Sequence, residues 1–94
     1  MGMLLLKGNE KPQDIIYLAY GLEAGLENFY EAAAKLAIAE EVVGVLAKLA
    51  AIEVRHKQKL FDLYQSINPG ATTLASFEST VNADYLFFKI CPSQ

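Results

Sequence analysis

Two glutamates and a histidine carry the strongest chemical signal in this sequence. Glu53 and His56 are three positions apart, so on a helix both side chains lie on one face, while Glu23 falls in an earlier segment. Carboxylate oxygens combined with an imidazole nitrogen suit iron or manganese better than a metal that prefers thiolates. The residue types and their spacing therefore predict a metal site built from two helical segments.

These ionisable residues interrupt two apolar stripes that have helical spacing. In steps of four and three, the first stripe comprises Ile16, Tyr20, Glu23, Glu27, Tyr30, Ala34 and Ala37. The second stripe comprises Val42, Leu46, Leu49, Glu53, His56, Leu60 and Leu63. Because burial of an unpaired carboxylate is costly, a carboxylate on a core stripe normally has a partner. We expect a metal ion to be that partner.

Two helices must position the candidate ligands. Helical periodicity continues almost without a break through residues 12–67, and Asn68-Pro69-Gly70 ends it. A single helix over this whole span would be abnormal in a small globular domain, so we expect a turn within residues 36–41. The chain is then divided into an N-terminal leader (1–11), a two-helix hairpin (12–67) and a C-terminal extension (68–94).

The C-terminal extension is less periodic than the hairpin. Thr72 and Thr73 could cap a short helix that runs through Phe77. The run Tyr85-Leu86-Phe87-Phe88 forms a compact apolar patch, which should pack on the hairpin or on a neighbouring chain.

One hairpin supplies only half of a two-metal site. It offers Glu23 from its first helix and Glu53 with His56 from its second, whereas two hairpins offer four carboxylates and two imidazoles. Four carboxylate charges balance two divalent cations, so the combined site would be close to neutral inside a low-dielectric core. We therefore predict an all-α hairpin that dimerises into a four-helix bundle, as a homodimer or within a larger homo-oligomer.

The two segments resemble the first half of a rubrerythrin or ferritin-like domain, over roughly residues 13–66. The resemblance rests on the runs Glu23-Ala-Gly-Leu-Glu-Asn-Phe-Tyr30 and Leu49-Ala-Ala-Ile-Glu53-Val-Arg-His56-Lys. That family pairs a Glu-x6-Tyr motif on its first helix with Glu-x-x-His on its second. The resemblance implies that Glu23, Glu53 and His56 bind iron, and that Tyr30 lies beside them as a hydrogen-bonding group.

The sequence departs from a full-length domain of that family in two ways. His56 is its only histidine, so no second Glu-x-x-His motif follows, and a single cysteine cannot build the four-cysteine iron site of rubrerythrin itself. The analogy is to half-length ferritin-like proteins, such as encapsulated ferritins, that assemble the bundle from two subunits. A truncated copy of a longer domain is the alternative.

The resemblance implies a di-iron protein that oxidises iron(II) with dioxygen or peroxide, as a ferroxidase or peroxidase-type oxidoreductase. Glu53 would be the bridging carboxylate, Glu23 a terminal ligand and His56 the nitrogen donor; manganese or zinc could replace iron. Glu27 is either a further ligand or the partner of a lysine. The alternatives are a metal-free structural or interaction domain, a half domain without turnover, and a module that stores or delivers metal.

The composition indicates which partners and which cellular compartment this protein has. A hydrophobic content of 53% with 20% charged residues indicates a folded chain, and a net charge of -3 argues against a nucleic-acid partner. The single thiol, Cys91, cannot form an intramolecular disulfide and suits a reducing compartment. No apolar run approaches the roughly 20 residues that span a bilayer. We therefore expect a cytoplasmic protein, with neither nucleic acid nor membrane as a partner.

Overall fold

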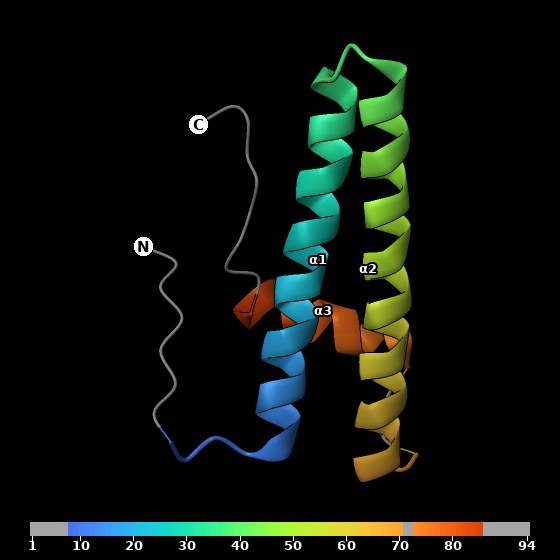
Figure 1. The fold of residues 1–94 in the computed structure, drawn as a ribbon. Helices are drawn as coiled ribbons and strands as arrows, with labels where there is room; N and C mark the ends of the chain where they lie inside the picture. The colour runs from blue at the N-terminus through green and yellow to red at the C-terminus, as the bar shows by residue number, and fades with distance from the viewer. Residues whose placement is uncertain (1–7, 71–72, 86–94) are drawn as a thin grey trace.

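The described part of the chain folds into three helices, which confirms the all-α prediction (Figure 1). The computed structural model describes residues 8–70 and 73–85. Helices α1 (Pro12–Leu36) and α2 (Glu40–Ile67) form an antiparallel hairpin, and the shorter α3 (Leu74–Asp84) crosses one face of it, behind the hairpin in Figure 1. The leader up to residue 7 and the Leu86-Phe87-Phe88 part of the apolar patch lie outside the described residues.

Local sequence explains where α1 and α2 begin. Pro12 occupies the first turn of α1, where its missing N–H is not needed, and the Asp14 carboxylate accepts a hydrogen bond from the Lys11 backbone N–H at 3.2 Å. The connection occupies residues 37–39, within the interval in which the turn is expected. Glu40 and Glu41 then form the first turn of α2, where the helix dipole favours negative charge.

Helix α3 is longer than the sequence predicted, because it continues from Leu74 to Asp84 instead of ending near Phe77. Its N-cap is Thr73, whose hydroxyl oxygen accepts a hydrogen bond from the backbone N–H of Ser76 at 3.2 Å. Phe77 and Val81, one turn apart, are both fully buried against the hairpin. Burial of Phe77 and Val81 stabilises α3 through tertiary packing. The full length of this helix was hard to predict because Ser and Thr residues interrupt its apolar pattern.

An aromatic core joins α3 to the hairpin. The ring of Phe77 lies at its centre, 4.7 Å from the ring of Tyr64 and 4.8 Å from that of Tyr20, measured between centroids. The buried members of this core are Ile16, Tyr20, Phe61, Tyr64, Phe77 and Val81. Large aromatic rings bury much apolar area, so this cluster is the main force that holds α3 in place.

Polar and steric contacts fix the position of α3 further. The Tyr20 hydroxyl donates a 2.5 Å hydrogen bond to the Glu78 carboxylate. At the end of α3 the backbone approaches α1 so closely that a Cβ at Gly21 would collide with the carbonyl oxygen of Tyr85. Glycine is therefore required at position 21 by the close approach of the two segments.

The opposite side of the hairpin is apolar, and the described residues leave it exposed. We define the open face by Ile15, Leu26, Phe29, Val45 and Leu63, whose side chains are 42–56% exposed. At about 100° per residue, these positions lie roughly 120–180° around their helices from Tyr17 and Phe61, which contact α3. In an antiparallel pair the two stripes face the same side, so α3 covers one face of the hairpin, and no other part of residues 8–70 and 73–85 covers the opposite face.

This arrangement corrects the stripe predicted for α2. Val42 and Leu63 were expected in the core, yet both are about half exposed, while Phe61 and Tyr64 are buried. The buried surface of α2 is displaced towards α3, because α3 supplies a second partner on that side. Among the described residues, none of the helices is both long enough and apolar enough to cross a membrane.

Candidate metal-binding site

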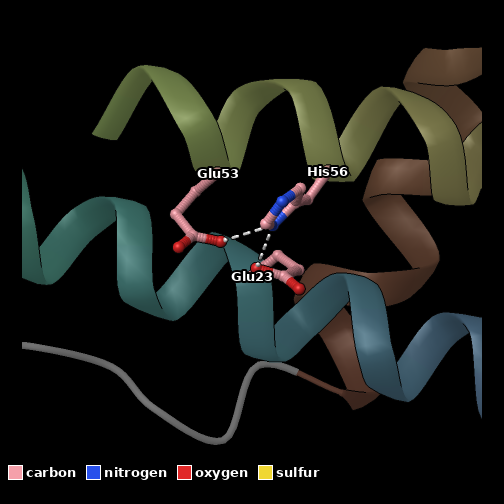
Figure 2. A group of neighbouring side chains, drawn as sticks. All are labelled: Glu23, Glu53 and His56. Atoms are coloured by element: carbon pink, nitrogen blue, oxygen red, sulfur yellow. Dashed lines mark hydrogen bonds and ion pairs between the residues drawn. The ribbon is translucent and has the colours of Figure 1, made fainter. Parts of the chain in front are cut away.

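The three predicted ligands meet near the middle of the hairpin (Figure 2). Nδ1 of His56 lies 3.2 Å from Oε1 of Glu53 and 3.4 Å from Oε1 of Glu23. One ligand atom from each residue can be chosen so that all three lie within 4.8 Å of one another. An ion about 2 Å from each donor needs donors within about 4 Å, so small side-chain rotations would complete the set. The donor types and their positions fit a divalent ion of the iron or manganese kind.

The three side chains differ in burial, and the difference gives the site a direction. The side chain of Glu53 is 9% exposed, that of Glu23 is 26% exposed and that of His56 is 47% exposed. On α2, His56 lies about 60° around the axis from Glu53, towards the open face, whereas the sequence placed it in the core. The site therefore opens from between the helices onto the uncovered apolar side of the hairpin.

The carboxylates repel each other when no cation lies between them. Partial burial, followed by a hydrogen bond and charge repulsion from Glu53, raises the pKa of Glu23 above its ordinary value of 4.5. The nearby His56 imidazole opposes this rise only in part. A positive ion between the two carboxylates would remove the repulsion, so the arrangement favours cation binding.

The sequence also predicts Glu27 and Tyr30 at or beside the site. Oε1 of Glu27 is 2.5 Å from Nζ of Lys57, which is the lysine pairing that the sequence left as an alternative to metal binding. Tyr30 packs its ring on Phe29 and, within the described part of the chain, has no hydrogen bond to the three candidate ligands. The structure thus gathers Glu23, Glu53 and His56, while roles for Glu27 and Tyr30 in metal binding stay predictions.

Lys57 is the residue near the site that sequence reasoning missed. It follows Glu53 by one turn, so the same spacing argument that selected His56 also places Lys57 on the face towards α1. Its side chain is 18% exposed, which is unusual for a lysine. The sequence did contain a signal for this lysine. Glu27 lies on the apolar stripe of the facing helix, and a carboxylate at such a position needs a cation as its partner.

No relative identifies this chain. Comparisons with models of protein families, with curated protein sequences and with solved structures give no match. The function of the chain is therefore inferred from its own residues and from their arrangement.

Proposed function

We propose that the protein is a non-haem di-iron carboxylate protein of rubrerythrin or ferritin-like type, which binds iron between two copies of the chain and oxidises iron(II) with dioxygen or peroxide. One observation carries the proposal: Glu23, Glu53 and His56, selected from their spacing and from the family resemblance, each offer a ligand atom within 4.8 Å of the others, beside an apolar face that the described residues leave exposed. Three protein donors leave a pair of metal ions under-coordinated, so a second copy has to supply the remaining donors.

The open face supports a second copy of the chain as the partner. Glu23 lies near the midpoint of α1, and Glu53 and His56 lie near the midpoint of α2. A twofold axis through the site would therefore place two hairpins side by side over almost their whole length. Homodimers are the commonest oligomers, and a twofold interface brings the same surface of each copy together.

The tip of the hairpin fits the same arrangement. Leu36 and Ile38, at the connection between α1 and α2, are 83% and 97% exposed. In a twofold dimer the tip would reach the opposite end of the second hairpin, where Ile15 and Ile67 are exposed. Burial of these side chains would add to the hydrophobic stabilisation of the dimer.

The residues of the chain have distinct tasks in this proposal. Glu53, buried between the helices, would hold both ions, Glu23 would bind one ion as a terminal ligand, and His56 would donate a nitrogen at the side nearest the second copy. The open faces exclude water once they are paired. Iron would supply the electrons that reduce dioxygen or peroxide. We place this chemistry in the reducing cytoplasm, where the lone Cys91 would stay reduced.

Anaerobic titration with iron(II), followed by addition of dioxygen, tests the proposal. We expect about one iron bound per chain and consumption of dioxygen on mixing. Iron binding without dioxygen or peroxide consumption would instead identify a storage or delivery module. A chain that binds no iron would be a structural or interaction domain.

A further inference from the structure

A second charged pair lies beside the three candidate ligands. Nζ of Lys57 is 2.5 Å from Oε1 of Glu27, and both side chains are less than one-fifth exposed. The same ammonium lies 5.7 Å from the centroid of the Tyr20 ring, which is within the range of a cation–π contact. Two contacts therefore hold a positive charge in the space between α1 and α2.

The helices place this pair next to the candidate metal site. Glu27 follows Glu23 by one helical turn on α1, and Lys57 follows Glu53 by one turn on α2. Side chains one turn apart on a helix have Cβ atoms about 5–6 Å from each other. The ammonium is therefore close enough to act on a bound cation through its charge, without being a ligand.

The Glu27–Lys57 pair is neutral as a whole, so the charge count shows what the ammonium of Lys57 alone would do. Each chain contributes three carboxylates, from Glu23, Glu27 and Glu53, and one ammonium, from Lys57. A dimer then carries six negative and two positive charges, a balance that two divalent ions neutralise. Two trivalent ions would leave two uncompensated positive charges in a site of low dielectric constant, which is unfavourable.

We propose that Lys57 neutralises Glu27 and thereby lowers the affinity of the site for trivalent relative to divalent ions, so that oxidised iron leaves and iron(II) rebinds. Without Lys57, the six carboxylate charges of the dimer would match two trivalent ions instead. This inference rests on the proposed function, because it assigns the charge selectivity of the same site. It makes Lys57 a specificity-determining residue that acts through its charge.

Binding of redox-inert ions tests this selectivity without any turnover. Manganese(II) and terbium(III) are titrated separately into each variant, and the ratio of the two affinities is compared. Lys57→Met removes the charge, keeps a similar length and can still contact the Tyr20 ring. The affinity for terbium(III) relative to manganese(II) should increase on the order of tenfold. This is the effect expected from removing one unit charge at roughly 10 Å from the bound ion. Lys59→Met, at an exposed lysine of the same helix, is the matched control and should leave the ratio unchanged.

Glu27→Gln provides the opposite change. It leaves the ammonium uncompensated, so the ratio should move away from terbium(III) by a similar factor. The double variant Lys57→Met with Glu27→Gln removes one charge of each sign, so its ratio should return to that of the unmodified protein. If Glu27 were a metal ligand, the double variant would bind both ions more weakly.

The outcomes separate this inference from the proposed function. An unchanged ratio in a folded Lys57→Met protein, with helicity checked by circular dichroism, overturns the inference. If Lys57→Met does not fold, Lys57→Gln decides in the same way, because it also removes the charge and its amide can still donate a hydrogen bond to the Glu27 carboxylate. Failure of the unmodified protein to bind either ion overturns the proposed function, and the inference with it.

Discussion

The carboxylate of Glu53 lies 3.2 Å from the imidazole of His56, yet the Glu53 side chain is buried between two helices and the His56 side chain is nearly half exposed. A metal ion bound by Glu53 and His56 would lie at the edge of the hairpin, next to the second copy of the chain that we propose on the open face. Metal binding and dimer formation would then be linked, since the second copy adds ligands and excludes water at once. Each event should strengthen the other.

The first prediction concerns the open face. Val45 and Val54 are both on α2 and are 56% and 47% exposed. They are nine residues apart, or about 180° around the helix axis, so they lie on opposite sides of α2. Val45→Lys should yield a helical monomer, because it places a charge in the proposed interface. Val54→Lys, the matched control, should remain a dimer. Light scattering coupled to size-exclusion chromatography measures both, and identical behaviour of the two variants would contradict the assignment of the interface.

The second prediction concerns the ligands. Glu53→Ala should abolish binding of manganese(II) at both positions, because a bridging carboxylate contacts both ions. His56→Ala should weaken binding on the order of tenfold or more, since the carboxylates remain. Neither change should unfold the chain, because Glu53→Ala removes the desolvation cost of a buried carboxylate and the His56 side chain is nearly half exposed. Glu31→Ala, at an exposed carboxylate of α1, is the control. Equal metal uptake by Glu53→Ala and the unmodified protein would exclude this site.

The third prediction follows from the raised pKa of Glu23. Because of burial and the Glu53 carboxylate, the Glu23 carboxyl group holds its proton more tightly in the folded, metal-free chain than in the unfolded chain. The resulting stabilisation is complete below pH 4.5, the ordinary pKa, and is lost as the pH rises through the raised value. Relative to Glu23→Gln, the metal-free protein should therefore lose stability across that window.

Adding manganese(II) should reverse this dependence on pH. The metal requires ionised Glu23, so its affinity, and the stability it adds, should increase as the pH rises through the same window. Denaturant unfolding curves with and without the metal measure both slopes. Parallel slopes in the two conditions would mean that the metal does not bind at Glu23.

The fourth prediction compares two glycines within helices. Gly21→Ala should destabilise the protein by about 1–3 kcal/mol, because the added Cβ collides with the Tyr85 carbonyl oxygen where α3 ends. Gly44→Ala should stabilise it by about 0.5–1 kcal/mol, because a Cβ there meets no atom and α2 gains helix propensity. Thermal unfolding measures both, and stabilisation by Gly21→Ala would show that α3 is not packed against α1.

The metal site was more predictable from sequence than the packing around it. Glu53 and His56 are close because both are on one helix, and three residues of separation fix their relationship regardless of the rest of the fold. Glu23 required only that an antiparallel hairpin form, and the turn at residues 37–39 was expected from the length of the helical pattern.

Burial on α2 could not be predicted in the same way. An apolar stripe shows which side chains seek burial, but not which partner covers each of them. Tyr64 is buried and Leu63 is exposed because α3, distant in sequence, covers one side of α2. That placement depends on contacts between remote segments, such as Gly21 with Tyr85, which periodicity does not show.

The most direct test of the central claim is to measure mass and metal content on the same sample. Native mass spectrometry of protein loaded with iron(II) under anaerobic conditions reports both quantities. We predict a dimer that carries two metal ions, and a shift towards monomer with a lower melting temperature after chelation. A monomer without metal, or a dimer whose mass and melting temperature are unchanged by chelation, would contradict a site shared between two copies.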